Sequence, residues 1–437
     1  MSLESRLLQA LDAWRQAPAW RIAFSGGLDS TVLLHLLARL RTRHRLPPLS
    51  AIHIHHGLQS VADSWVELCR AQCEALGIPL QVRQVRVDGR ASLERAAREA
   101  RYAAFSAMLG EGEALLAAQH QDDQAETLLL RLLRGAGVRG LAAMPASRSL
   151  GAGHLLRPLL GVSRGELEVW ARREQLTWIE DPSNRDTRLS RNFLRHEILP
   201  RLVRHWPAAV AVLARDAEQL AEADGLLGEL AELDLVAAST SADPSWLALP
   251  SLALAPLRAL SVARQRNALR HWLRGLSLPP EREHWAGWEA LRDAGEDAAP
   301  RWRLAGGELR RAGGRLWWLS GDWLRAPAPG ALVWSDPLRP LTLPGNGRVW
   351  LEGVSPVREL QIRYRLGGEV LALAGRGHRD LKRVLQENGV PSFVRGRLPL
   401  LYAGERLLAV ANLPQLRLSG TPLQLCWEGP TGGAGLS

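Results

Sequence analysis

The sequence contains only three cysteines, Cys69, Cys73 and Cys426, in 437 residues. Cysteines so few and so unevenly spaced exclude a disulfide framework and indicate a reducing compartment. No apolar run approaches about twenty residues, which excludes a membrane-spanning helix. The first residues also lack the basic stretch and apolar segment of an export signal. With no repeats and 46% hydrophobic residues, we expect a cytoplasmic protein of two or three domains with no membrane partner.

Lysine is nearly absent, since Lys382 is the single lysine among 55 basic residues. A GC-rich genome explains the preference for arginine, but not the sign of the net charge, which is +10. Residues 355–420 hold eleven basic and five acidic residues, a net charge of +6. This concentration predicts a polyanionic partner, usually nucleic acid, because each neutralised phosphate releases counterions.

Short β-type runs alternate with longer helical patterns from residue 19 to about 160, which predicts an α/β fold with a doubly wound parallel sheet. The predicted strands cover residues 20–24, 49–55, 80–85, 114–118 and 154–160. Past residue 210 the texture becomes helical, and residues 301–350 are rich in Trp and Gly, which is typical of short strands and tight turns. We predict a catalytic domain at 1–209, a mainly helical domain with a Trp-rich tail at 210–350, and a small, basic, mixed α+β domain at 351–437.

The strongest motif is Ser25-Gly26-Gly27-Leu28-Asp29-Ser30, directly after the first predicted strand and directly before the first helix. Adjacent glycines let backbone N–H groups approach phosphate oxygens, serines add hydroxyl donors, and a helix N-terminus favours an anion. The motif therefore predicts a phosphate-binding loop, although the same residues also suit an ordinary helix cap. It is not a Walker loop or a dinucleotide fingerprint, because the Gly-Lys-Ser/Thr ending and the Gly-x-Gly-x-x-Gly spacing are absent.

Acidic residues follow the fourth predicted strand. Asp122 and Asp123 lie at the carboxyl end of a parallel sheet, where open α/β folds bind ligands. Glu126 comes three residues after Asp123, so a helix places both carboxylates on one face. These acids can hold Mg²⁺ or attract an ammonium group, or they can reflect the usual preference for acids at a helix start. Cys69 and Cys73 lack the further ligands of a zinc or iron–sulfur site, so we expect them in the core.

A series of segments in register resembles the tRNA(Ile)-lysidine synthetases, a family of the PP-loop, or N-type, ATP pyrophosphatases. The segments are SGGLDS at 25–30, HIHHGL at 53–58, ERAAREARY at 94–102, HQDDQAET at 120–127, RGAGVRGL at 134–141, EDPSN at 180–184 and RNFLR at 191–195. The resemblance continues at 264–273, 375–383 and 397–402, but not over 280–350. It implies a Rossmann-like PP-loop fold and cleavage of ATP, with Mg²⁺, between the α- and β-phosphates.

The resemblance also implies a reaction in which L-lysine is ligated to the unmodified wobble cytidine of tRNA(Ile) through an adenylated base. The implied ATP-binding residues are Ser25, Gly26, Gly27, Leu28, Asp29, Ser30, His55 and His56. The implied lysine-binding residues are Asp122, Asp123 and Glu126, and the implied tRNA-binding residues are Arg191, Arg195, Arg376, Arg379, Lys382 and Arg383. Asp29 is expected to act in catalysis and at Mg²⁺, while Arg98 and Arg101 neutralise charge on the α-phosphate. One departure is Gln119, where many relatives carry histidine.

Two other functions stay open. A tRNA thiolase of the same superfamily needs a sulfur-carrying cysteine or a cysteine-ligated cluster near the loop, for which Cys69 and Cys73 are the only candidates. A non-catalytic tRNA-binding protein would not need the intact loop at 25–30. In the basic segment, residues 376, 379 and 383 are spaced by three and four, so if residues 380–386 form a helix, the three share a face that can follow a phosphate backbone. The sequence does not decide between a monomer and a homodimer.

Overall fold

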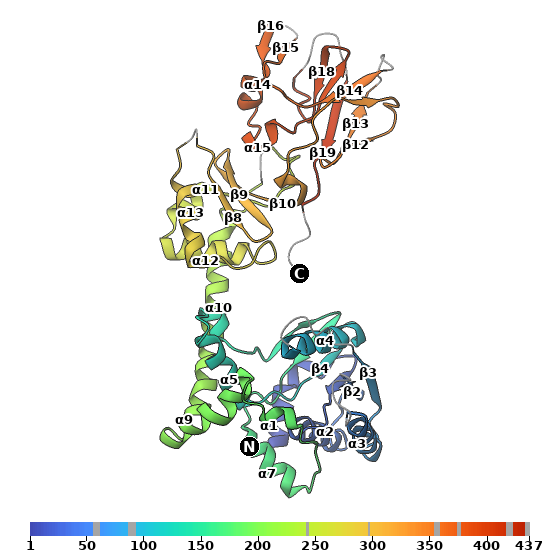
Figure 1. The fold of residues 1–437 in the computed structure, drawn as a ribbon, viewed down its shortest axis with the longest axis vertical. Helices are drawn as coiled ribbons and strands as arrows, with labels where there is room; N and C mark the ends of the chain where they lie inside the picture. The colour runs from blue at the N-terminus through green and yellow to red at the C-terminus, as the bar shows by residue number, and fades with distance from the viewer. Residues whose placement is uncertain are drawn as a thin grey trace. The chain divides into compact units, whose positions relative to one another are not determined.

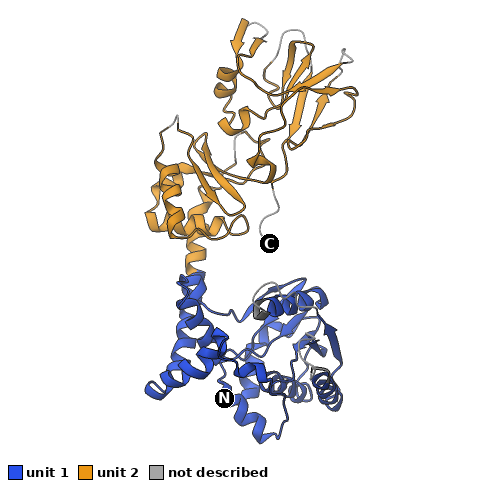
Figure 2. Ribbon diagram, in the orientation of Figure 1, with its two compact units in different colours: residues 1–225 blue, residues 226–437 orange. Residues whose placement is uncertain are grey.

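The computed structural model describes residues 1–55, 62–85, 93–241, 244–295, 298–353, 359–373, 377–416 and 423–432. The chain divides into two compact units, Met1–Gly225 and Leu226–Ser437 (Figure 2). The division falls within α10, Ala209–Val236, which is the long helix that the Ala- and Leu-rich sequence after residue 210 predicts. The division into three domains at 209 and 350 stays a prediction.

Unit 1 is built on a six-stranded sheet with the order β3-β2-β1-β4-β6-β5 (Figure 1). The strands are β1 Trp20–Ala23, β2 Leu49–His55, β3 Leu80–Gln84, β4 Ala114–Leu116, β5 Ser147–Leu150 and β6 Gly153–Leu156. All pairings are parallel except that of β5 with β6, so the sheet is mixed. The sequence does not predict β5, because three of its four residues are exposed and it lacks apolar alternation. The predicted fifth strand ends early, at Leu156, close to Pro158, which has no N–H for a sheet hydrogen bond.

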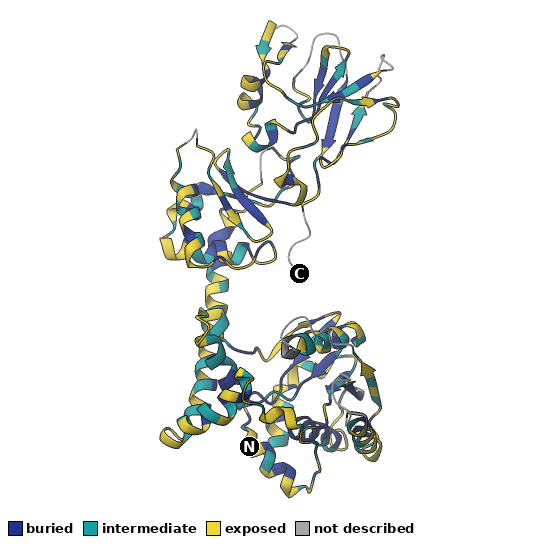
Figure 3. Ribbon diagram, in the orientation of Figure 1, coloured by how far each residue is buried: buried dark blue, intermediate teal, exposed yellow. Residues whose placement is uncertain are grey.

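Helices cover both faces of this sheet. The helices α1 Leu3–Ala10, α2 Leu28–Arg41, α3 Ala62–Ala75 and α7 Arg164–Arg173 share one core with Trp20 and Ile22 of β1. On the opposite face, α4, Leu93–Met108, packs against Ile52 of β2 and Leu155 of β6. The central strands are buried on both faces, as Figure 3 shows, because successive side chains point to opposite sides. Cys69 and Cys73 lie in the first core, as predicted.

The helices that carry the acidic and RNFLR segments lie beyond the sheet. β4 leads into α5, Gln121–Leu132, and α6, Val138–Leu141, follows. The RNFLR segment forms α8, Ser190–Phe193, and a π-helical turn, Leu194–Ile198, before α9, Leu199–His205. In this turn the N–H of Leu199 donates to the carbonyl of Leu194. Pro200 cannot donate the next helical hydrogen bond, which explains why the helix widens here.

Unit 2 begins with helices and an antiparallel sheet. The helices are α11 Leu254–Ala259, α12 Val262–Trp272 and α13 Trp285–Asp293, and the sheet order is β7-β10-β9-β8. Its strands are β7 Ser251–Ala253, β8 Arg301–Leu304, β9 Gly307–Ala312 and β10 Arg315–Ser320. Trp302 and Trp318 from the strands pack with Trp285 and Trp288 of α13 in one core. The Trp-rich region thus starts with the short strands that the sequence predicts.

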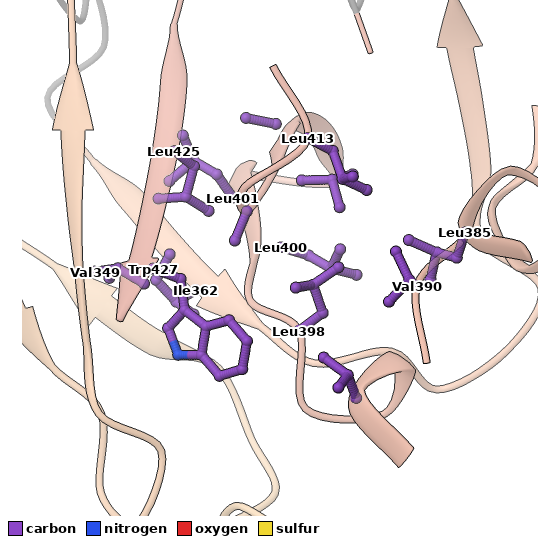
Figure 4. Packing of buried hydrophobic residues seen from close by; sticks show 14 of the residues in the cluster. Val349, Ile362, Leu385, Val390, Leu398, Leu400, Leu401, Leu413, Leu425 and Trp427 are labelled. Atoms are coloured by element: carbon purple, nitrogen blue, oxygen red, sulfur yellow. The ribbon is translucent and has the colours of Figure 1, made fainter. Parts of the chain in front are cut away.

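The rest of unit 2 consists of small antiparallel sheets and two short helices. The elements are β11 Leu332–Trp334, β12 Leu341–Thr342, β13 Arg348–Glu352, β14 Leu360–Arg363, β15 Val370–Leu373, β16 Gly377–Asp380, α14 Leu381–Glu387, α15 Ser392–Arg395, β17 Leu400–Ala403, β18 Arg406–Val410 and β19 Gln424–Glu428. Strands pair across residue 350, since β11 pairs with β14 and β13 with β19. Their apolar faces meet in one core, part of which Figure 4 shows.

The order along the chain is therefore a mixed, mostly parallel α/β sheet, then helices, then antiparallel sheets. Within the described ranges, no helix is both long enough and apolar enough to cross a membrane.

Candidate active site

The glycine-rich loop lies at the carboxyl edge of the sheet, between β1 and α2. The hydroxyl groups of Ser25 and Ser30 are 3.0 Å apart, and Ser30 Oγ also donates to the carbonyl of Gly27 over 3.0 Å. Gly27 is the N-cap of α2 and has no side chain to cap it, so the first N–H groups of this helix are left for a ligand. Because the helix dipole also favours negative charge there, the loop can bind phosphate.

Gly26 is the position that shapes this loop. Its φ is +81°, which side-chain-bearing residues rarely adopt, and an added Cβ would come within 2.4 Å of Ile179 Cδ1 and 2.9 Å of Cys69 Sγ. The carbonyl of Gly26 accepts a hydrogen bond of 2.8 Å from the N–H of Ile179. The loop is therefore pressed against the segment that follows α7, and only glycine fits at this point.

His120 joins the loop to the acidic segment. β1 and β4 are parallel neighbours, so the loop after β1 and His120 after β4 meet at the same edge. The imidazole is 1% exposed, and its Nε2 lies 3.6 Å from Asp29 Oδ2 and 3.5 Å from Asp123 Oδ2. Its Nδ1 lies 3.6 Å from Asp122 Oδ2. His120 also begins α5 as its N-cap.

The three carboxylates keep His120 positively charged. Burial alone would lower the pKa of His120, but the contacts with Asp122 and Asp29 and the charge of Asp123 raise it to about 10. Burial works against ionised Asp123 as well, yet the charges of His120, Arg191 and Arg195 lower the pKa of Asp123. An imidazolium surrounded by ionised aspartates therefore links the loop with α5.

Asp123 and Glu126 are held by two arginines. Arg191 Nε donates to Glu126 Oε2 over 2.7 Å, and Arg195 Nε donates to Glu126 Oε1 over 2.6 Å. The Nη2 atoms of Arg191 and Arg195 lie 2.9 and 3.0 Å from Asp123 Oδ1. The acids are one turn apart on α5, and the arginines are four residues apart across α8 and the π-helical turn. Glu126 is fully buried, so this paired arrangement meets the requirement that buried charges have partners.

The structure brings most of the predicted site residues to this edge, but not all of them to one point. Asp122 accepts a hydrogen bond of 2.8 Å from the N–H of Arg164, at the start of α7. Arg191 and Arg195, which we predict to contact tRNA, point instead to the α5 acids. His55 is the last residue of β2, and His56 lies outside the described residues.

The two arginines of α4 diverge. Burial lowers the pKa of His53 against the effect of the Phe24 hydrogen bond, and the positive charge of Arg101 lowers it further. Arg98 instead lies over the ring of Tyr102 at 5.0 Å. The roles assigned to both arginines, and to the loop and the α5 acids, stay predictions.

Two histidines belong to the site although the sequence does not single them out. His53 Nδ1 donates to the carbonyl of Phe24 over 2.9 Å, directly before the loop, and lies 3.5 Å from Cys69 Sγ. His53 and His120 both stand in the motifs quoted above. Their place near the carboxyl ends of β2 and β4, the two strands that flank β1, is the signal that could have identified them.

In the basic segment, the helix expected over residues 380–386 is present as α14, but Arg379 lies before it, so the expected shared helical face is wrong. Arg379 lies on β16 and Arg383 on α14, because Asp380 caps the helix by accepting from the N–H of Arg383. The two arginines still lie together, since both bond Glu387 Oε1, at 2.9 and 3.1 Å. Lys382 is exposed beside them, and Arg376 lies outside the described residues.

Asp29 offers a ligand for a divalent cation. Its Oδ1 is buried and has no hydrogen-bond partner among the described residues. In those residues, no group of three His, Cys, Asp or Glu side chains forms a metal cage. The donors thus fit Mg²⁺ that arrives with nucleotide phosphates, because Mg²⁺ in such sites takes one or two carboxylates and completes its shell with phosphate and water.

Comparisons with known families define the class of the fold. Residues 1–202 match the PP-loop domain, in agreement with the loop between β1 and α2 at the edge of a parallel sheet, and this domain binds ATP. Residues 252–317 match the TilS substrate-binding domain, and residues 360–421 match the TilS substrate C-terminal domain.

Full-length relatives give the family. The tRNA(Ile)-lysidine synthase of Pseudomonas aeruginosa is 62% identical, over 100% of this chain and 99% of its own length. Its counterpart in Pseudomonas fluorescens is 61% identical, over 95% of this chain and 94% of its own length. That of Pseudomonas syringae is 59% identical, over 100% of this chain and 98% of its own length. The chain belongs to the tRNA(Ile)-lysidine synthase family, and it is an ATP-dependent ligase that modifies tRNA.

Proposed function

We propose that unit 1 carries out both steps of lysidine formation at the carboxyl edge of its sheet, with ATP at the loop and L-lysine at the α5 acids. The observation that carries this proposal is the buried His120, which lies 3.6 Å from Asp29 of the loop and 3.5 Å from Asp123 of α5. One imidazolium thus connects the residues expected to serve the two steps. The family membership supports the same division of roles.

In the first step, O2 of the wobble cytidine attacks the α-phosphorus of ATP. A P–O bond forms, the bond between the α-phosphorus and the bridging oxygen breaks, and pyrophosphate leaves. The uncapped N–H groups at the start of α2 stabilise the charge of the departing pyrophosphate. Bound Mg²⁺, held by Asp29, would neutralise part of the triphosphate charge. The cytidine must leave the anticodon stack to reach this edge.

In the second step, the ε-nitrogen of lysine attacks C2 of the adenylated base. A C–N bond forms, the C2–O2 bond breaks, and AMP leaves with that oxygen. The amine must first lose a proton, which the carboxylate of Asp123 or Glu126 takes up. Both acids are bound by arginines in this structure. We infer that the ammonium group takes over part of these contacts, since the four carboxylates at the site outnumber its three cations, His120, Arg191 and Arg195.

Pyrophosphate release tests the first step. We expect Asp29→Ala to abolish pyrophosphate release that depends on both ATP and unmodified tRNA(Ile), while the protein stays folded. Asp12→Ala is a matched control, because Asp12 is an exposed acid of the same unit that pairs with Arg15 on the surface. Pyrophosphate release near the wild-type rate in folded Asp29→Ala would contradict the assignment of the loop.

A further inference from the structure

Tyr102 is the centre of an arginine cluster that includes Arg98, one of the two arginines expected at the α-phosphate. Tyr102 and Arg98 lie on α4, and Arg148 lies on β5. The Cζ atoms of Arg98 and Arg148 are over the tyrosine ring, 5.0 and 5.1 Å from its centre. Arg157, directly after β6, is buried, and its Nη1 donates to the carbonyl of Pro145 over 2.7 Å. Three guanidinium groups from three elements thus gather around one ring.

Among the described residues, no acid balances the positive charge of this cluster. In the part of the chain that the structure describes, neither Arg98, Arg148 nor Arg157 forms an ion pair with a carboxylate. By contrast, Arg172 on the surface of the same unit pairs with Glu168 over 2.6 Å. The Nε of Arg157 is buried and lacks a hydrogen-bond partner among the described residues. Guanidinium groups that lie close together without a carboxylate partner are suited to an anion.

The pKa values of Tyr102 and Arg157 indicate the same excess of positive charge. Burial alone would raise the pKa of Tyr102, but the charges of Arg98, Arg157 and Arg148 lower it. Burial lowers the pKa of Arg157, and the charges of Arg148 and Arg98 lower it further, against the opposing effect of Tyr102. These shifts have the sign that a site for a negative ligand requires.

The cluster lies at the same edge of the sheet as the active site. Arg157 follows the carboxyl end of β6, and β6 is the parallel neighbour of β4, which leads to His120. Arg98 lies in the first half of α4, the helix that leaves the carboxyl end of β3. Arg148 is exposed on the edge strand, between Ser147 and Ser149, which are exposed as well. An exposed strand at the margin of the site suits an extended ligand that continues past the nucleotide-binding loop.

We propose that Arg98, Arg148 and Arg157, gathered around Tyr102, bind a backbone phosphate of the RNA next to the nucleotide that reacts. This inference rests on the proposed function, which brings the wobble nucleotide to this edge. RNA suits the cluster because guanidinium groups bind phosphate, while arginine and tyrosine also offer flat faces for an unstacked base. The phosphates of ATP share the anionic chemistry, so the experiment must separate the two sources.

Arg148→Ala is the decisive variant, because Arg148 is exposed and its guanidinium bonds only the carbonyl of Ser149 within the described residues. We measure tRNA binding by the full-length protein without ATP, across a salt series, and then the KM for ATP. Removing an arginine that binds one phosphate of single-stranded RNA reduces the slope of log K for tRNA binding against log salt concentration by about 0.7. This change corresponds to about a fivefold loss of tRNA affinity at about 0.1 M salt. The KM for ATP stays unchanged.

Two further variants sharpen this test. Arg148→Lys keeps the charge and is expected to restore the salt slope. Arg172→Ala removes one exposed arginine elsewhere in unit 1 and is expected to leave tRNA affinity unchanged. A raised KM for ATP with unchanged tRNA affinity would overturn the RNA assignment in favour of nucleotide phosphate, and no change in either would overturn the site. Because binding is measured without ATP, the result does not depend on the Asp29→Ala outcome.

Discussion

Gly26 is the residue whose identity the loop tolerates least. Gly26→Ala places a methyl group 2.4 Å from Ile179 Cδ1 in a backbone conformation that disfavours any side chain. We expect the free energy of unfolding to fall by about 1–3 kcal/mol and ATP affinity to fall with it, because the loop must move to relieve the clash. Thermal unfolding and nucleotide titration measure both effects.

Gly165→Ala is the matched control for this prediction. Gly165 lies in α7, and an added Cβ meets no atom within 4 Å. This substitution is expected to stabilise the protein by up to about 1 kcal/mol, because alanine favours helix. If Gly26→Ala matched Gly165→Ala in melting temperature and ATP affinity, the strain assigned to Gly26 would not exist.

His120 makes stability depend on pH. Its pKa rises from 6.5 to about 10 on folding, so its contribution is complete below pH 6.5 and is lost as the pH rises toward 10. Across this interval the free energy of unfolding of the wild type is expected to fall, relative to His120→Gln, by up to about 1.4 kcal/mol per pH unit. Urea unfolding of both proteins at several pH values measures the difference, and parallel pH profiles would argue against a charged His120.

Ion pairs join helix α5 to α8 and to the π-helical turn that follows it. Glu126→Gln removes one of the two buried carboxylates that pair with Arg191 and Arg195, and leaves only Asp123. We expect a loss of about 1–3 kcal/mol in the free energy of unfolding, measured by urea denaturation. Glu168→Gln on α7 is the control, because its partner Arg172 is highly exposed and such pairs contribute about 0–1 kcal/mol.

The same acids separate the two chemical steps. Asp123→Asn and Glu126→Gln are expected to impair lysidine formation more than pyrophosphate release, because the acids are assigned to the amino acid and not to ATP. Assaying the two products in the same reaction gives the comparison. Equal losses of both products would remove the distinction between a nucleotide side and a lysine side of the site.

The π-helical turn and the β16–α14 junction show why local sequence patterns predict only part of the arrangement of the arginines. The sequence identifies Arg191 and Arg195 through the RNFLR motif, but the orientation of Arg195 depends on the wide turn before Pro200. In the same way, the spacing of Arg379 and Arg383 suggests a shared helical face, whereas the expected helix begins at Asp380 and leaves Arg379 on β16. The sequence does not show that Arg379 and Arg383 are paired, but in the structure both form ion pairs with Glu387.

We expect both units to contact tRNA, whereas only unit 1 is expected to bind ATP. Replacing Arg379, Lys382 and Arg383 together by alanine should lower the salt slope of tRNA binding by about 0.7–0.9 for each phosphate that these side chains neutralise. ATP affinity should not change, because its loop belongs to unit 1. Arg348→Ala, an exposed arginine of unit 2 paired with Glu428, serves as the control.

The tRNA contacts of the basic segment are better tested by substitution than by truncation of the chain. Removing the chain after residue 355 would take β19 away from β13 and remove much of a shared core. An unchanged tRNA affinity and salt slope in the folded triple variant would mean that other residues carry the tRNA contacts.

The sequence by itself determined the α/β class of the first fold, the position of the glycine-rich loop and the family. These depend on short-range features: apolar strands, a glycine pair before a helix, and motifs whose residues are neighbours in the chain. The basic segment at 355–420 is equally visible, because net charge does not depend on folding. The loop needs only a strand before it and a helix after it, so its chemistry can be predicted locally.

Only the tertiary structure decided which charges meet. His120 touches Asp29 because β1 and β4 are neighbours in the sheet, although about ninety residues separate them in the chain. The pairing of Arg191 and Arg195 with the α5 acids, and the grouping of Arg98, Arg148 and Arg157 around Tyr102, likewise join distant segments. In a chain with 55 basic residues, the pattern cannot say which arginines are paired and which are left for a ligand. That depends on distance and burial, which arise only when strands and helices pack.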